Sequence, residues 1–564
     1  MKKILLTLLL VTALVFTACG GNDAPGTGET TPEETTGTET ESESESAEIV
    51  PGQYLNTYLV SEPTTLDPSK GADSYSNSIL INILEPLVRL EENEDGSVEV
   101  TPAGAENYEV SEDGLTHTFT IRAGNKWHDG QEVTAEDYAY GIKRSLNPET
   151  GSPYSFLLTM IKNAPAVLDG TMGVDDLGVT VDGNKLIVEL ERMTPYFSQI
   201  AYQRVMMPQR ADLVEQHGQA YGAEPQFSNG PYKIDSWTHN AEIILSKNEN
   251  YWDAANVQLE KVTLKIIQDE NTIYNAFDVG EIDNVGSNRP EWRERFEAKD
   301  NVTHKAIVNP QTFFLFFNTQ DEVFKNDKVR LAFSTAIDRE DLANVIFDGV
   351  MTPAYGWIPP QITAGAEQYR DQVEEPLKAL MEGKDPKELL VEGLTELGMD
   401  PDPANLTVTI SLGGADQFFR DYAEYLGNTF NTKLGVTAES DLNQWEIFDG
   451  KVQEGNFQMG YMAWGADYND PSSMLGLFDS KNAAIATGWV NEEFDKLIAD
   501  AASETDEATR LDLFKQAEQL LIEEAPVSPV VFPGSNVYRY DYYTGIGYNP
   551  FDTTGLKNGS TAGR

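Results

Sequence analysis

The chain has 564 residues, and its 92 acidic and 40 basic residues give a formal net charge of −52. A surface this acidic excludes nucleic acid as a partner, because nucleic-acid binding depends on Lys and Arg side chains that displace counterions. Forty percent hydrophobic and 10% aromatic residues describe a globular protein, and the length predicts two or three domains.

The amino terminus, "MKKILLTLLLVTALVFTACGG", has two lysines, an apolar run that ends at Phe16 and then small residues. The run is too short to span a bilayer, which needs about 20 apolar residues, so residues 1–18 are predicted to be a signal peptide. The segment "FTAC" resembles the lipobox of bacterial lipoproteins, although Phe16 stands where Leu is usual. That resemblance implies lipidation of Cys19, the single cysteine of the chain. An ordinary secretory signal with an incidental cysteine is the alternative.

Residues 19–49 follow as a stretch without aromatic or basic side chains, rich in Glu, Thr, Ser and Gly. Such a composition cannot bury enough apolar surface to offset the entropy of ordering the chain. We therefore predict a disordered acidic tether, extended by repulsion between its like charges. Because the protein would be repelled by an anionic lipid surface, it should contact the membrane through the lipid anchor only.

The folded part alternates predicted strands and helices. A strand is expected at 117–122, followed by a helix that runs to about Leu146 and opens with a capping box from Thr134 to Asp137. The segment "GVTVDGNKLIVELER" predicts a hairpin around an Asp-Gly turn. Strand, turn and strand are predicted again at 229–253.

Further along the chain the helical pattern becomes more frequent. Two amphipathic helices are predicted within 326–347, parted at Asp338. Strand, helix and strand at 406–414, 416–430 and 435–444 have the order of a βαβ unit. A long helix over 507–526 is expected to end at its proline. The mixture predicts an α/β fold without internal repeats.

The segment "MAWGADYNDP", residues 462–471, is predicted to be a loop. Asp and Asn favour turns, and Pro471 biases Asp470 away from helical conformation. By spacing alone Asp467 is a solvated turn residue.

Signatures of enzymes are missing from the sequence. The five histidines are scattered, without a His-x-x-x-His pair, and there is neither a G-x-S-x-G elbow nor a phosphate-binding P-loop. We therefore expect no catalytic residues, no metal and no cofactor.

Several segments together resemble the extracytoplasmic solute-binding proteins of family 5, which serve peptide and nickel importers. The matching segments run in the order of the family from about residue 54 to 550: "SEPTTLDPS" (61–69), residues 108–148, "NGPYKI" (229–234), "NENYWD" (248–253) and "VRLAFSTAIDRE" (329–340). Within the family, "SPYSFL" (152–157), "NQWEIF" (443–448) and "AWGADYNDP" (463–471) are most similar to oligopeptide-binding members.

The resemblance implies a large periplasmic-binding-protein type of α/β fold, in which two lobes close over a ligand and an extra domain is inserted. Lobe one would comprise residues 50–90, 214–315 and 532–564, the extra domain 91–213, and lobe two 316–531. Closure of such lobes is a hinge motion that lets a transporter distinguish the liganded form.

The same resemblance implies a peptide-binding site. Asp467 would bind the free α-ammonium of the ligand, Trp464 would frame the first side-chain pockets, and the backbone around Ala463 and Gly465 would pair with the extended peptide. Trp445 and Tyr154 match positions that line side-chain pockets.

One departure from the resembling proteins concerns the far end of the ligand. Where relatives that bind short peptides hold the carboxylate with basic residues, this chain has Phe419, Val452, Gln453 and Tyr461. Lys451 and Arg420 lie one position away, and a helix-surface position is expected for Arg420. The length of the ligand is therefore left open.

The family resemblance also implies the partners and the location. We expect a monomer that captures oligopeptides with a free amino terminus and delivers them to an ABC permease. It would be anchored as a lipoprotein to the outer face of the cell membrane of a Gram-positive bacterium. Two alternatives stay open: the same fold binding a dipeptide, signalling peptide, nickel chelate, heme or oligosaccharide, and a surface hydrolase or adhesin built on that fold.

Overall fold

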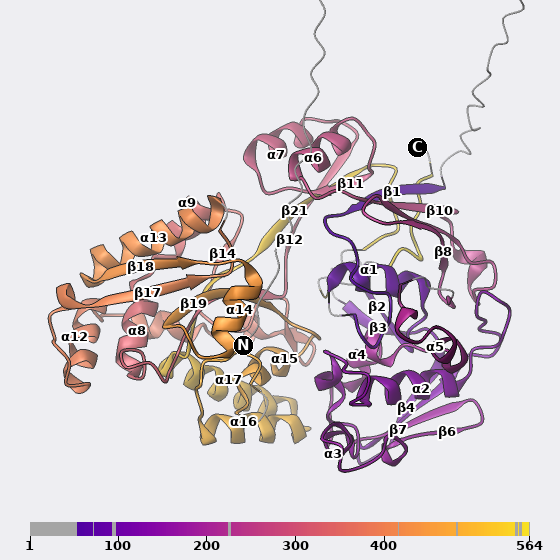
Figure 1. Ribbon diagram of the computed structural model, residues 1–564, viewed down its shortest axis with the longest axis horizontal. Coiled ribbons are helices and arrows are strands. Elements are labelled where there is room, and N and C mark those ends of the chain that lie inside the picture. The colour runs from indigo at the N-terminus through magenta and orange to yellow at the C-terminus, as the bar shows by residue number, and fades with distance from the viewer. Residues whose placement is uncertain are drawn as a thin grey trace, which may run out of the picture. The chain divides into compact units, whose positions relative to one another are not determined.

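The computed structural model describes residues 53–562 apart from 72, 93–97, 224–226, 416, 481–482, 548–550 and 552–554. The predicted signal peptide over residues 1–18, Cys19 and the predicted tether over 19–49 lie outside the described residues. Within the described part, helices and strands alternate along the chain, as the sequence predicts for an α/β protein (Figure 1).

The largest sheet of the described residues has six strands in the order β14-β20-β13-β19-β17-β18. Strands β17 and β18 are parallel and are joined by α13 (Gln417–Leu434), which confirms the predicted βαβ unit. Strand β13 lies in the middle and pairs antiparallel with β19 on one side and β20 on the other. The strands are β13 (Gln311–Phe317), β14 (Thr352–Pro353), β17 (Thr407–Leu412), β18 (Thr437–Leu442), β19 (Met459–Gly465) and β20 (Val527–Phe532).

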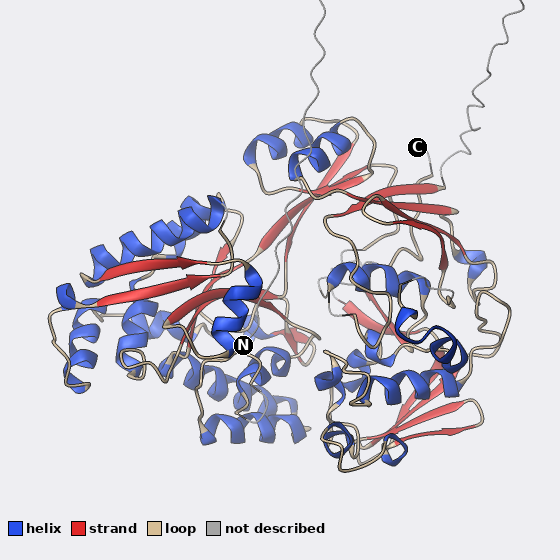
Figure 2. Cartoon of the chain, viewed as in Figure 1, coloured by secondary structure: helices blue, strands red, loops and turns tan. Residues whose placement is uncertain are grey.

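Helices pack around this sheet (Figure 2). The predicted pair of helices is found as α8 (Asp327–Ala336) and α9 (Arg339–Phe347), parted at Asp338, whose carboxylate accepts a hydrogen bond from the Asp341 N–H at 3.0 Å. The other helices of this part are α10 (Tyr369–Gln372), α11 (Pro376–Met381), α12 (Pro386–Glu396), α14 (Trp445–Gln453), α15 (Pro471–Leu475), α16 (Glu492–Ser503) and α17 (Glu507–Glu524).

Two further sheets combine segments that are distant in the sequence. One has the order β1-β10-β9-β8, in which β1 pairs in parallel with β10, and the other has the order β11-β21-β12. The strands are β1 (Tyr54–Leu59), β8 (Tyr232–Thr238), β9 (Glu242–Lys247), β10 (Lys261–Ile266), β11 (Asn284–Gly286), β12 (Val302–Val308) and β21 (Gly534–Tyr540). Helices α1 (Ser74–Ile83), α6 (Glu270–Asp278) and α7 (Pro290–Glu297) lie beside these strands, and α5 (Ala211–His217) lies near α2 (Ala135–Leu146) (Figure 1).

A fourth sheet, with the order β4-β5-β7-β6, is built from one continuous stretch of chain. The predicted hairpin pairs β6 with β7, and the predicted capping box is present, since the Asp137 carboxylate accepts from the Thr134 N–H at 2.8 Å. The elements of this stretch are β4 (Ala105–Val110), β5 (Thr116–Ile121), α2 (Ala135–Leu146), α3 (Ala164–Leu168), β6 (Val179–Asp182), β7 (Lys185–Glu189) and α4 (Phe197–Ile200). Two small ribbons pair β2 (Val88–Glu92) with β3 (Val98–Pro102) and β15 (Thr363–Ala364) with β16 (Glu367–Gln368).

The described part of the chain passes between the three-stranded and the six-stranded sheet twice, at adjacent places. Strand β12 leads into β13 through Asn309 and Pro310, and β20 leads into β21 through Pro533. The Asn309 N–H donates to the carbonyl of Pro533 at 2.9 Å, so the two connections lie side by side.

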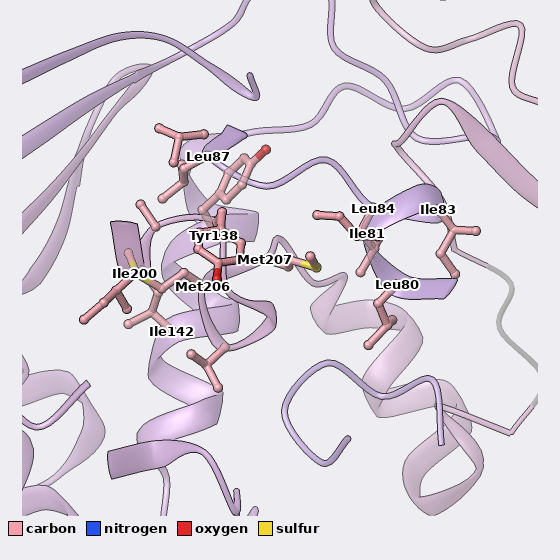
Figure 3. Close-up of a cluster of buried hydrophobic side chains, with 14 of the residues drawn as sticks. Leu80, Ile81, Ile83, Leu84, Leu87, Tyr138, Ile142, Ile200, Met206 and Met207 are labelled. Carbon is pink, nitrogen blue, oxygen red and sulfur yellow. The ribbon is translucent and has the colours of Figure 1, made fainter. Parts of the chain in front are cut away.

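The buried apolar residues of the described part form four clusters rather than one. The first cluster includes side chains of α1, of Tyr138 and Ile142 on α2, and of Met206 and Met207; Figure 3 shows Met207 between α1 and the other labelled residues. Residues 314–531 supply most of the second cluster and all of the third. Separate cores permit rigid parts that move against one another, and the boundaries of lobe one, the extra domain and lobe two stay a prediction.

Candidate functional site

The six-stranded sheet has a gap between two of its neighbouring strands. Strand β17 pairs with β19 only as far as Leu412 and Tyr461, whereas β19 continues to Gly465 along β13. Within the described residues, no strand pairs with the last part of β19 on the β17 side. An unpaired strand edge presents N–H and C=O groups that can pair with another chain.

The register shows which backbone groups face this free edge. The Ala466 N–H donates to the carbonyl of Pro310 at 2.8 Å, which places Thr312 and Trp464 in a hydrogen-bonded pair. Because such pairs alternate along antiparallel strands, the N–H and C=O groups of Ala463 and Gly465 point away from β13. The two residues predicted to contribute main-chain pairing therefore direct their backbone groups to the free edge.

The loop predicted for residues 462–471 is wrong in its first half, because β19 extends to Gly465. Pairing with β13 overrides the preference of Gly465 for a turn, whereas Asp467, Asn469 and Asp470 follow the strand. Trp464 lies within this strand, is half-buried and packs against the second hydrophobic cluster.

Asp467 lies two residues after Gly465, the last residue of β19. Hydrogen bonds to its backbone groups hold it in place. Its N–H donates to Ser473 Oγ at 2.8 Å, and its carbonyl accepts from Gln203 Nε2 at 2.8 Å and from the Tyr202 hydroxyl at 3.2 Å. None of the described residues donates a hydrogen bond to its carboxylate. Burial raises the pKa of Asp467 to about 6, and the positive charge of Arg204 opposes this rise.

Asp470, three residues further on, has the opposite surroundings. Its carboxylate is buried and accepts from Arg510 Nη1 at 2.7 Å and Nη2 at 2.9 Å, and from the Ser472 N–H at 3.0 Å. As predicted, Asp470 is not helical: it caps α15, which begins at Pro471. This bidentate pair fixes the loop that carries Asp467.

Tyr154 is connected to Asp467 through Arg204. The Arg204 guanidinium is stacked over its ring at 4.2 Å from the ring centre. Because Arg204 also acts electrostatically on Asp467, the structure brings two of the predicted site residues together through a third.

Trp445 lies toward the other end of the free edge. Its ring lies against Gly413, the residue at which β17 leaves β19, so closely that a Cβ on Gly413 would come within 2.7 Å of it. Trp445 is 52% exposed, unlike a core tryptophan. An exposed indole beside unpaired backbone groups is suited to packing against a ligand side chain.

The segment Tyr202 to Arg204, which supports Asp467, was not predicted from the sequence. A signal existed, because Gln203 and Arg204 lie within the apolar run "IAYQRVMM", where buried polar side chains need partners. Gln199 adds two contacts, donating to the carbonyl of Asn469 at 3.2 Å and accepting from its N–H at 2.8 Å.

No charge is present at the four positions expected at the far end of the ligand, Phe419, Val452, Gln453 and Tyr461. Lys451 Nζ donates to Asp441 at 2.7 Å and to Asn443 at 3.2 Å. Arg420 is exposed on α13, as predicted for a helix-surface residue, and donates to the carbonyl of Ala415.

Two cavities of about 550 and 510 Å³ occur elsewhere in the described part, and Asp467 lines neither. Across the described residues, His, Cys, Asp and Glu form no group of three or more that could hold a metal ion. No helix of the described chain is both long and apolar enough to cross a membrane.

A free strand edge followed by a half-buried carboxylate, within a mixed α/β fold, defines a ligand-binding protein. Residues 99–485 match the model of bacterial extracellular solute-binding proteins, family 5. The chain belongs to this family, whose members are binding proteins and not enzymes, and the resemblance seen in the sequence is confirmed.

Curated relatives and solved structures agree with this assignment. The chain is 32% identical over 537 residues to the oligopeptide-binding protein OppA of Bacillus subtilis (strain 168), covering 94% of this chain and 93% of that protein. It is 33% identical over 499 residues to the dipeptide-binding protein DppE of the same organism, covering 88% and 90%. The substrate-binding domain of an oligopeptide ABC transporter from Bacillus anthracis str. Ames matches with a TM-score of 0.74 and 28% identity, covering 90% of this chain and 98% of that chain.

Replacing Asp467 by Asn should stabilise the ligand-free protein at pH 7.5 by on the order of 2 kcal/mol. The carboxyl has a pKa of about 6 when folded and an ordinary value of 3.8. Ionisation is therefore less favourable in the folded state, and this cost is absent below pH 3.8 and complete above pH 6. Urea unfolding at pH 7.5 and pH 5 should show a larger gain at the higher pH.

Asp470→Asn is the matched control, because it removes the same charge three residues away. Breaking its buried pair with Arg510 should lower the free energy of unfolding by about 3–5 kcal/mol. Equal effects of the two substitutions would contradict the different surroundings of the two carboxylates.

Proposed function

We propose that this protein binds peptides with a free amino terminus, holds them as an extended strand against the free edge of β19, and delivers them to an ABC importer. The single observation that carries the proposal is the Asp467 carboxylate, which has no hydrogen-bond donor among the described residues. A carboxylate in such a place is suited to an ammonium ion, because each charge supplies what the other loses on leaving water.

The site supports a peptide over other ligands of the fold. Main-chain pairing with Ala463 and Gly465 would hold any peptide, because it does not depend on the side chains of the ligand. Trp464, Trp445 and Tyr154 would then contact individual side chains. A dipeptide, a signalling peptide, a nickel chelate, heme or an oligosaccharide is the alternative, and Asp467 favours ligands with a free amine.

Closure over the ligand would occur at the paired connections around Asn309 and Pro533. Hinges absorb dihedral changes in a few residues at the ends of elements. Two adjacent connections of this kind would allow the predicted lobes to approach each other while their cores stay intact. The relatives named for oligopeptide binding and ABC transport support the peptide ligand and the importer of this proposal.

We expect the charge of Asp467 to dominate affinity for the amino terminus. Asp467→Asn keeps the shape of the side chain and removes its charge, so binding of a free-amine peptide at pH 7.5 should fall about 30- to 1000-fold, or about 2–4 kcal/mol. N-acetylated peptide should bind the wild type poorly, and the variant should narrow the difference between the two peptides.

Calorimetry on two proteins and two peptides completes a double-mutant cycle, whose coupling term separates direct contact from general damage. Circular dichroism checks that the variant is folded. The assignment fails if folded Asp467→Asn binds the free-amine peptide within about threefold of the wild type.

Pairing at the free edge predicts an alternating pattern along the ligand. Replacing a single peptide N–H by an ester oxygen should weaken binding about threefold to tenfold at every second position, because alternate groups of a strand face its neighbour. Positions between these should change little. Equal losses at all positions, measured by calorimetry over an ester series, would rule out a paired strand.

The lipid anchor is a separate part of the proposal. We propose that Cys19 is lipidated and holds the protein at the outer face of the membrane of a Gram-positive cell, as a monomer that meets its permease there. Cys19→Ala should abolish incorporation of a labelled fatty acid, because the chain has no other thiol. Label retained on the variant would show that the lipid is attached elsewhere.

A further inference from the structure

Arg204 is a buried cation that the proposed peptide site leaves without a role. It begins a short turn of helix, Arg204–Met206, and its residue surface is only 4% exposed. Charged side chains are seldom buried to this extent unless another group satisfies them. The buried guanidinium therefore requires hydrogen-bond acceptors or an opposite charge.

Within the described residues, few groups accept a hydrogen bond from Arg204 or balance its charge. Its Nη1 donates to the carbonyl of Asp73 at 3.3 Å, and its Nε is buried without a hydrogen-bond partner. No carboxylate of the described chain forms an ion pair with it. Its guanidinium face is stacked on Tyr154, which satisfies the π surface but accepts none of its N–H groups.

Arg204 also belongs to the wall around Asp467. The two residues before it, Tyr202 and Gln203, donate to the Asp467 carbonyl at 3.2 and 2.8 Å. The guanidinium acts electrostatically on the Asp467 carboxylate, although no hydrogen bond joins them. Two opposite charges therefore border the same site without neutralising each other by contact.

This arrangement restricts which ligand fits. An ammonium bound by Asp467 would lie near a second cation, and like charges close together in a site that excludes water repel strongly. The repulsion is offset if the ligand also brings an oxygen acceptor to Arg204. Guanidinium binds carboxylates in a fixed two-pronged geometry, which makes it selective for acidic groups.

We infer that Arg204 binds an oxygen acceptor near the amino terminus of the ligand, so that the protein selects peptides with Asp or Glu at one of their first two positions. This inference rests on the proposed peptide function and adds a preference for one class of peptide. Only one of the two positions should show the preference, because neighbouring side chains of an extended strand point to opposite faces.

The test uses alanine-based pentapeptides with a free amino terminus that carry Glu or Gln at position 1, 2 or 5. The Glu-to-Gln affinity ratio at position 5 measures how the overall negative charge of the protein affects the binding of an acidic peptide. In the wild type, the Glu-to-Gln affinity ratio at position 1 or 2, but not at both, should exceed the ratio at position 5 by about tenfold or more.

Three variants locate the effect. Arg204→Gln should reduce the ratio to that of position 5, whereas Arg204→Lys should keep part of it because the charge is retained. Arg192→Gln removes an exposed positive charge from the same stretch of chain and should leave the ratio unchanged. Circular dichroism and the affinity for all-alanine peptide report whether each variant is intact.

The inference is overturned if the wild-type ratios at positions 1 and 2 lie within about threefold of that at position 5, or if Arg204→Gln keeps the selectivity. The wild-type panel decides the matter even if Arg204→Gln does not fold. Binding without selectivity would overturn this inference alone. Failure of every free-amine peptide to bind would overturn the proposed function as well.

Discussion

A charge that leaves water must find a partner, and this requirement governs the region around Asp467. Asp470 meets it within the protein, through the two hydrogen bonds from Arg510 that anchor the loop. Asp467, on the same loop, does not meet it, and its pKa is raised to about 6. The buried pair of Asp470 with Arg510 makes the loop rigid, and the Asp467 carboxylate, which lacks a hydrogen-bond donor among the described residues, favours binding of a cation. Two Asp residues of one loop therefore have different roles: Asp470 anchors the loop and Asp467 recognises the ligand.

The free edge of β19 follows the same logic for neutral groups. Backbone N–H and C=O groups that are removed from water need hydrogen bonds. The departure of β17 at Gly413 leaves those of Ala463 and Gly465 without a strand partner, while β13 keeps the other edge of β19 fixed. A rigid strand with one open edge is prepared for an extended chain before any ligand arrives, which limits the entropy lost on binding.

The site draws its residues from parts of the chain that fold around different cores. Asp467 and Trp464 belong to the six-stranded sheet and its loop, whereas Tyr154, Gln203 and Arg204 come from the stretch around the β4-β5-β7-β6 sheet. Contacts from Gln203 and Gln199 reach main-chain atoms of the Asp467 loop. Because these contacts are made to backbone atoms, they fix the position of the loop and do not involve the side chains of residues 467 and 469.

The sequence by itself determined the family, the α/β class, the βαβ unit, the capping box and the helix pair at Asp338, because these depend on local spacing, capping and motifs. It also singled out Asp467 through resemblance, but composition and spacing alone made that residue an ordinary turn. Only the tertiary structure decided that β19 continues to Gly465, that its edge is free, and that Arg204 borders Asp467. Those facts depend on which strands pair and which segments meet across more than 260 residues, and the hydrophobic periodicity of one segment does not identify its distant partner.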